Sequence, residues 1–110
     1  MDLSYEVNDH YAEISAAGRL NMVSAPKLRE LVAEVVEGGS SRIVINLKET
    51  SFMDSSGLGA LIGCLKAARQ AGGDLRIAGV QPQVQMVLGL TSMDKVLTSY
   101  PTAAAAFGDD

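Results

Sequence analysis

The sequence predicts a single α/β domain in which a mixed β-sheet, begun by an N-terminal hairpin, packs against about four helices. Strand-like and helix-like segments alternate along the 110 residues, and 47% of these residues are hydrophobic. The apolar runs 43–47 and 75–80 lie between helical patterns, which is typical of buried parallel strands. A chain of this length forms one domain. We therefore expect residues 1–110 to be one unit, with a core over about 3–107 and a frayed tail at 108–110.

The hairpin is predicted from alternation at the start of the chain. Apolar and polar residues alternate over 3–7, and an extended pattern resumes over 11–17. The turn residues Asn8-Asp9 lie between them, so the two segments form an antiparallel pair. Gly18 is expected to end the second strand.

An amphipathic helix follows the hairpin. Ser24 is a favourable N-cap residue, and Pro26 is tolerated in the first helical turn. The apolar residues that follow recur at helical spacing and form one stripe; they are Leu28, Leu31, Val32, Val35 and Val36. Gly38-Gly39 is expected to end this helix.

The remaining elements follow from apolar runs separated by glycine and proline. In chain order we expect a buried strand at 43–47, a helix at 55–71, a strand at 75–80, a short helix from Pro82, an edge strand at Val96-Leu97, and one or two helical turns within 101–107. Consecutive β-α-β units imply a sheet that is largely parallel beyond the hairpin.

Charge and composition exclude several classes of function. Nine Lys and Arg residues against 13 Asp and Glu residues give a net charge of −4, which predicts neither nucleic-acid binding nor insertion into an anionic membrane. Cys64 is the sole cysteine, so no internal disulfide forms and a reducing compartment is favoured. Because the start of the chain lacks a signal-peptide pattern and no apolar run is long enough to span a membrane, we expect a cytoplasmic protein.

Residues 52–59, Phe-Met-Asp-Ser-Ser-Gly-Leu-Gly, carry the most chemical information. They follow a buried strand and open a helix, where backbone N–H groups lack partners and the helix dipole favours negative charge. One interpretation is structural: a polar side chain caps the helix and the glycines permit a tight turn. The other is that a serine accepts a phosphate, which a helix N-terminus accommodates. The two are compatible.

This segment resembles the phosphorylation segment of STAS-domain anti-sigma factor antagonists, and 18–21 followed by 25–28 resembles that family's second signature. The resemblance extends from Leu3 to about Phe107. It implies that Ser55 is the phosphoacceptor, with Ser56 the second choice. It also implies an anti-sigma factor partner with ATP-dependent serine kinase activity, which the unphosphorylated antagonist binds, thereby freeing a sigma factor for transcription. Phosphorylation ends the binding, and a serine phosphatase restores it.

The chain departs from this family at a loop that usually carries an acidic pair. Arg19 and Asn21 occupy those positions, which bears on partner choice. The predicted partner-binding residues cluster around the helix start and the neighbouring connections; they are Arg19, Asn21, Met22, Met53, Asp54, Ser55, Ser56, Leu58 and Met93. The alternative is a constitutive STAS accessory subunit of an ABC-type lipid transport complex.

No catalytic or metal centre is predicted. Neither serine lies in a Gly-x-Ser-x-Gly elbow, and His10, the only histidine, is expected in a solvated hairpin turn. One histidine and one cysteine do not make a metal site. Gly57 and Gly59 lack the third glycine of a dinucleotide loop. We expect a protein that is not an enzyme and uses no cofactor.

Overall fold

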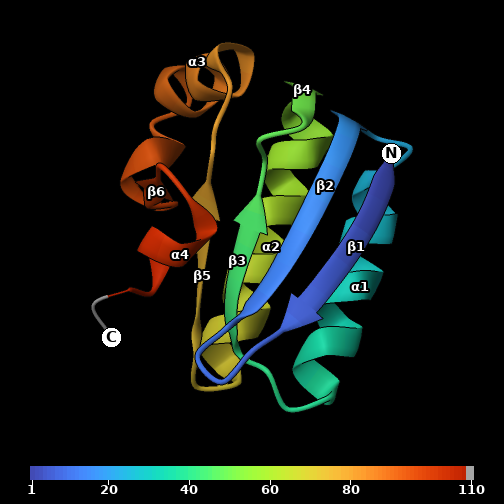
Figure 1. The fold of residues 1–110 in the computed structure, drawn as a ribbon. Coiled ribbons are helices and arrows are strands. Elements are labelled where there is room, and N and C mark those ends of the chain that lie inside the picture. The colour runs from blue at the N-terminus through green and yellow to red at the C-terminus, as the bar shows by residue number, and fades with distance from the viewer. Residues whose placement is uncertain (109–110) are drawn as a thin grey trace.

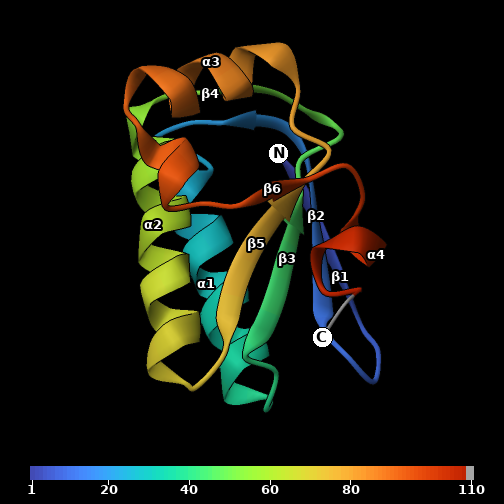
Figure 2. The same ribbon diagram turned by 90° about the vertical axis from the view of Figure 1, so that its left-hand side faces the viewer.

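The computed structural model describes residues 1–108, which form a six-stranded sheet with helices on both faces (Figures 1 and 2). The strands are β1 (Asp2–Val7), β2 (Ala12–Leu20), β3 (Arg42–Asn46), β4 (Thr50–Met53), β5 (Asp74–Ala78) and β6 (Ser99–Tyr100). The helices are α1 (Ala25–Glu37), α2 (Ser55–Gln70), α3 (Pro82–Leu90), α4 (Ala103–Ala106) and the short 3-10 helix η1 (Met93–Lys95). The last two residues of the predicted frayed tail lie outside the described part of the chain.

The strand order confirms the predicted mixed sheet. The strands lie in the order β1-β2-β3-β5-β6, and β4 pairs with β2 outside this path. The hairpin pair β1–β2 is antiparallel, whereas every other pair is parallel. The parallel pairs follow from β-α-β crossovers through α1, α2 and α3, as the alternation of elements predicts.

Two apolar layers hold the helices to the sheet. The larger core lies between the sheet and the layer of α1, α2 and α3, while a smaller core joins the opposite face to α4 (Figure 2). In β3, Ile45 faces the larger core and Val44 faces α4, and both are 0% exposed. These two residues of the predicted buried strand therefore lie at the centre of the sheet, covered on both faces.

The second strand is longer than predicted, because Gly18 does not end it. β2 continues to Leu20, and its register shifts between Gly18 and Arg19. Gly18 has a φ of +114°, a conformation that residues with a side chain rarely adopt. The strand therefore bends at the glycine and changes its parallel partner from β3 to β4.

Strand β4 was not predicted, and the last strand lies later in the chain than the predicted Val96-Leu97. In β4, Thr50 is 0% exposed and its hydroxyl donates to the carbonyl of Ala16 at 2.8 Å. The edge strand is β6, whereas Val96 lies in a turn after η1 and Leu97 packs into the larger core. Within residues 1–108, no helix is long and apolar enough to cross a membrane.

Candidate functional site

The start of α2 lies at one end of the molecule, beside the β2–α1 connection and α3 (Figure 1). Strand β4 leads directly into α2 through Asp54. The Gln83 side chain fastens α3 to this strand: its amide oxygen accepts from the Met53 N–H at 2.8 Å, and its amide nitrogen donates to the Met53 carbonyl at 3.1 Å. Three separate segments are thereby brought to the end that carries the predicted site.

Asp54 caps α2. Its backbone is extended, and its carboxylate accepts a hydrogen bond from the Gly57 N–H at 2.9 Å. Its own N–H donates to the Leu20 carbonyl at 3.2 Å, which fixes the cap against the end of β2. Ser55 is the first residue of the helix and is exposed, while Ser56 is half-buried. The structural task at this helix start therefore falls to the aspartate, and the Ser55 side chain faces solvent.

Gly57 permits a very close approach between α2 and β2. A Cβ atom at this position would lie 2.3 Å from the Leu20 carbonyl oxygen, which is far inside van der Waals contact. Only glycine fits there without a backbone shift. The start of α2, including Ser55, is thus held directly against the sheet.

The β2–α1 loop is organised by two polar side chains. The Ser24 hydroxyl donates to the Arg19 carbonyl at 2.7 Å and accepts from the Asn21 N–H at 2.9 Å. The Asn21 side-chain oxygen accepts from the N–H groups of Val23 at 3.0 Å and Ser24 at 3.2 Å. Ser24 occupies the predicted N-cap position of α1, but its side chain makes no capping bond to that helix. It closes the loop instead.

This loop presents charged and apolar groups to solvent. Met22 and Val23 are 72% and 71% exposed. The exposed Arg19 guanidinium lies over the Phe52 ring, 4.5 Å from its centroid. Arg19 is paired with Phe52 in the β2–β4 register, and Phe52 lies two residues before the cap residue Asp54. The contact therefore holds the arginine close to the start of α2.

The structure does not expose every predicted partner-binding residue. Met53 is 1% exposed and Leu58 is 8% exposed, because both side chains pack into the larger core. Met93 is half-buried against the same core. The side chains of Met53 and Leu58 therefore support the site from within, which corrects the expectation that they form its surface.

Sequence reasoning missed Met86 as a surface residue at this end. On α3, Val84 and Leu88 are buried, whereas Met86 is 54% and Leu90 is 80% exposed. The helical spacing could have indicated this. Val84 and Leu88 are four residues apart and share the buried face, whereas Met86 and Leu90 each follow one of them by two residues and so lie on another face of α3. Together with the loop residues, they give this end several exposed apolar side chains.

Two other residues with potentially reactive side chains are Cys64 and His10. Cys64 is 2% exposed, and burial raises the pKa of its thiol to about 11, although the nearby Arg29 charge opposes this. Among residues 1–108, no three His, Cys, Asp or Glu side chains gather as metal ligands. His10 lies in the exposed hairpin turn, as predicted, where its backbone N–H donates to the side-chain oxygen of Asn8 at 2.8 Å.

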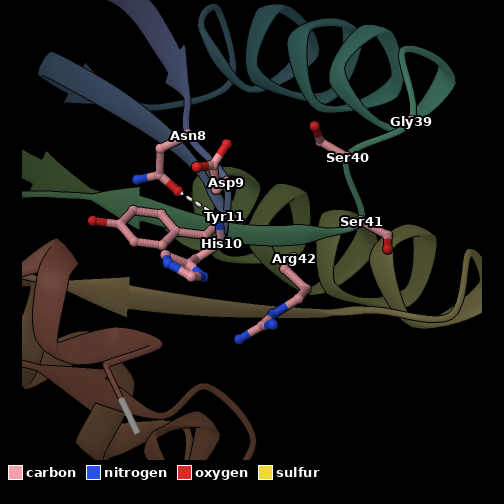
Figure 3. Close-up of a pocket in the computed structure, with 8 residues that line it drawn as sticks. All are labelled: Asn8, Asp9, His10, Tyr11, Gly39, Ser40, Ser41 and Arg42. Atoms are coloured by element: carbon pink, nitrogen blue, oxygen red, sulfur yellow. Dashed lines mark hydrogen bonds between the residues drawn. The ribbon is translucent and has the colours of Figure 1, made fainter. Parts of the chain in front are cut away.

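His10 also lines a small pocket at the end of the molecule opposite the start of α2 (Figure 3). The pocket lies between the hairpin turn and the α1–β3 connection, and Arg42 borders it. Its polar lining comes from two turns, and it lies apart from the exposed serine and the apolar side chains described above.

Comparison with known proteins decides the family. The family description that matches residues 2–106 is the STAS domain. The chain belongs to the STAS domain family. The resemblance that residues 52–59 and the segment 18–28 suggest is therefore confirmed, and the STAS fold accounts for nearly all of the described residues.

Several STAS relatives carry the name of one function. An anti-sigma-B factor antagonist of Staphylococcus aureus is 31% identical over 99 residues, which cover 88% of this chain and 92% of the relative. A candidate anti-sigma factor antagonist of Thermotoga maritima superposes with a TM-score of 0.89 at 25% identity, covering 97% of this chain and 92% of that one. An antagonist from Mycobacterium paratuberculosis gives a TM-score of 0.85 at 27% identity, covering 97% and 91%.

Proposed function

We propose that this STAS domain is an anti-sigma factor antagonist controlled by phosphorylation. It binds an anti-sigma factor with serine kinase activity, frees a sigma factor for transcription, and releases its partner when Ser55 is phosphorylated. A serine phosphatase reverses the modification. The names of the Staphylococcus aureus and Mycobacterium paratuberculosis relatives support the antagonist role. Because such a partner uses ATP and controls transcription, the proposal includes a cytoplasmic location for this domain.

The exposed Ser55 beside a helix cap provided by Asp54 carries the proposal. Because Asp54 satisfies the Gly57 N–H, the Ser55 hydroxyl has no structural duty at the cap. A kinase has access to this side chain without unfolding the helix. Ser56 is half-buried, which favours Ser55 as the acceptor.

A phosphate on Ser55 is compatible with the fold. A phosphoserine adds about −1.5 to −2 charges at neutral pH. At the first position of a 16-residue helix, the dipole and the free N–H groups stabilise that charge. The phosphorylated domain therefore stays folded.

The same phosphate opposes a docked partner. It would lie next to the Asp54 carboxylate, on a surface whose other exposed groups include Met22 and Val23. A partner would have to remove water from the phosphate, and any facing acidic group would repel it. A penalty of about 1.4 kcal/mol already weakens binding tenfold. Such a change is sufficient for a switch.

The chain itself supplies no catalytic group in this proposal. The partner contributes the kinase and its ATP, while the STAS domain contributes the acceptor hydroxyl and a binding surface. Purified protein should therefore hydrolyse neither nucleoside triphosphates nor esters. Turnover that disappears in a Ser55→Ala variant would overturn this part of the proposal.

The decisive experiment captures the partner and then maps the modification. Tagged Ser55→Ala protein, which cannot be released by phosphorylation, should retain an anti-sigma kinase in its native cell. The isolated kinase and ATP should then modify wild-type protein at Ser55, as mass spectrometry of the peptide spanning both serines would show. Ser56→Ala is the matched control and should be phosphorylated like the wild type.

Two outcomes would contradict the proposal. Modification of Ser56 alone would move the acceptor by one residue. If an active kinase modifies neither serine and the captured partner is a transporter ATPase, the chain is the accessory subunit of a lipid transport complex. In that case the start of α2 is a permanent contact and no switch exists.

A further inference from the structure

Strand β1 forms an open edge of the sheet. Among the described strands it pairs only with β2, and Figure 1 shows it at the margin of the sheet beside α1. Edge strands expose backbone groups that pair readily with another chain, so natural proteins protect them with lysine, proline or a covering segment. The six residues of β1 contain neither lysine nor proline.

The outward-facing backbone of β1 belongs to its apolar residues. The Asn8 N–H donates to the Tyr11 carbonyl at 3.0 Å, which makes these two residues a hydrogen-bonded pair. Hydrogen-bonded and non-hydrogen-bonded pairs alternate along an antiparallel ladder. The N–H and C=O groups of Val7, Tyr5 and Leu3 therefore point away from β2.

The side chains of these residues lie on the face of the sheet that α1, α2 and α3 cover. Tyr5 is opposite Ile14 and Val7 is opposite Ala12, and both β2 residues are buried in the larger core. Directly opposed residues project from the same face. Nevertheless, Tyr5 remains 49% exposed and Val7 remains 55% exposed. The β1 edge thus offers apolar side chains and unpaired backbone together.

A groove of about 530 Å³ runs between this strand and α1. Leu3 and Leu31 contribute apolar lining, and both pack against the larger core. The charged lining consists of Glu30, Glu34, Glu37 and Lys27. Three carboxylates and one ammonium group give the groove a net charge of −2. An acidic wall therefore faces the open strand.

The charge decides which occupant fits. A second copy docked edge to edge would bring two acidic α1 walls to one interface, in a chain whose net charge is already −4. Like charges across an interface are costly. An extended segment that carries apolar and basic side chains on one strand face would instead pair its backbone with β1, pack its apolar residues beside Tyr5 and Val7, and place its cations against the three glutamates.

We propose that the β1 edge and the adjoining α1 groove bind an extended segment of a partner protein that presents both apolar residues and Lys or Arg on one strand face. The segment adds a seventh strand to the sheet. This surface does not include the start of α2, so it is independent of phosphorylation at Ser55. It would allow one STAS domain to hold a second protein while the start of α2 is engaged by the first.

The probe is an end-blocked eight-residue peptide in which valine and lysine alternate along one strand face and serine occupies every position of the other face. Titrated into the isotope-labelled full chain, it should shift the backbone amide resonances of Leu3, Tyr5 and Val7 most. The double variant Glu30→Lys with Glu34→Lys should bind at least tenfold more weakly. A peptide that is N-methylated at alternate residues should also lose binding, because strand pairing needs its N–H groups.

The matched control is Glu49→Lys with Asp94→Lys, which makes the same charge change at two exposed positions outside the groove. This variant and Ser55→Asp should bind the peptide like the wild type, and circular dichroism should confirm that all variants are folded. No shift at millimolar peptide would overturn the proposal. So would equal binding of a valine–glutamate peptide, or an equal loss in the control variant. A concentration-dependent dimer that Val7→Lys abolishes would assign the edge to a second copy instead.

Discussion

Asp54 allows two adjacent polar residues to have different tasks. Its carboxylate holds the Gly57 N–H, and its backbone holds the end of β2. If a serine capped the helix instead, its hydroxyl would have to accept the hydrogen bond from the same N–H group. With the cap supplied by the aspartate, Ser55 stays exposed on a rigid helix start. Rigidity and accessibility at one position are what a regulated acceptor needs.

Arg19 stands where the resemblance described above leads us to expect an acidic residue, and its contact with Phe52 fixes its position near the start of α2. Charges around an interface mainly set the rate of encounter with a partner. We expect Arg19→Glu with Asn21→Asp to lower the association rate with the natural partner by about tenfold at low salt, with a smaller effect at high salt. Asn21→Asp keeps the side-chain oxygen that holds the loop, so the loop should survive.

Stopped-flow or surface-based kinetics over a range of salt concentrations would measure this effect. Lys66→Glu, an exposed charge reversal farther along α2, is the control and should change the rate little. Identical rates and salt dependence for the loop variant and the wild type would place the β2–α1 loop outside the interface.

Cys64 should make stability depend on alkaline pH. Burial raises the pKa of its thiol from 9.0 to about 11. The folded thiol stays protonated while the unfolded one ionises, so the unfolded state binds fewer protons between these two pH values. The free energy of unfolding should therefore fall as the pH rises from 9 to about 11, in total by about 2–3 kcal/mol.

Urea unfolding at pH 8 and pH 10.5 would measure this dependence, with Cys64→Ala as the comparison. The variant should be less stable at pH 8, because it loses buried contacts, but its stability should fall less between the two pH values. If both proteins show the same fall, the thiol does not contribute to it.

At the scale of elements, the start of α2 could be predicted from the sequence, whereas the end of β2 could not. The α2 boundary was predictable because aspartate, serine and glycine have strong positional preferences at a helix start. The extension of β2 through Gly18 was not, because a glycine normally signals a strand end. Here its positive φ creates a bend inside the strand.

The missed strand β4 explains the error at Met53. Within Thr50–Met53, Thr50 and Met53 are buried, Ser51 is exposed and Phe52 is half-buried, so burial does not follow the simple alternation of a strand with one buried face. A four-residue segment with two polar residues gives too little pattern to predict this pairing. The sequence could therefore locate the site by its helix but could not separate its surface residues from the ones beneath them.

Gly57 gives a direct test of how closely two elements must approach. In Gly57→Ala, the new methyl group would lie 2.3 Å from the Leu20 carbonyl oxygen. The helix start must shift away from β2, at a cost of about 1–3 kcal/mol, and the Asp54 cap should loosen. We expect lower stability in urea and altered phosphorylation at Ser55.

Gly59→Ala is the matched control on the same helix. Its Cβ would meet no atom closer than 3.8 Å, the Arg29 side chain. Alanine favours helices over glycine by about 1 kcal/mol, so this variant should equal or exceed the wild type in stability. A Gly57→Ala protein that behaves like Gly59→Ala would contradict the close packing of α2 on β2.

At the scale of the whole molecule, one short helix completes the second face of the sheet. α4 has only four residues, yet with Phe107 it covers Val44 and Ala78, which are 0% exposed. The Phe107 ring stacks on Tyr11 with centroids 5.8 Å apart. The guanidinium carbon of Arg76 lies 4.3 Å and that of Arg42 lies 4.9 Å from the ring centroid. Phe107 thus joins α4 to β3, to β5 and to Tyr11, the residue before β2.

We therefore expect Phe107→Ala to lower the free energy of unfolding by about 3–5 kcal/mol. Domains of this size have a total stability of about 5–15 kcal/mol, so the loss should be evident as a large drop in the urea midpoint. Tyr5→Ala, an aromatic truncation at a half-exposed position on the opposite face, should change stability by less than about 1 kcal/mol. If the two variants are equally stable, α4 is an accessory segment. If Phe107→Ala alone is destabilised, the domain needs both faces of its sheet covered to keep Ser55 on a rigid helix.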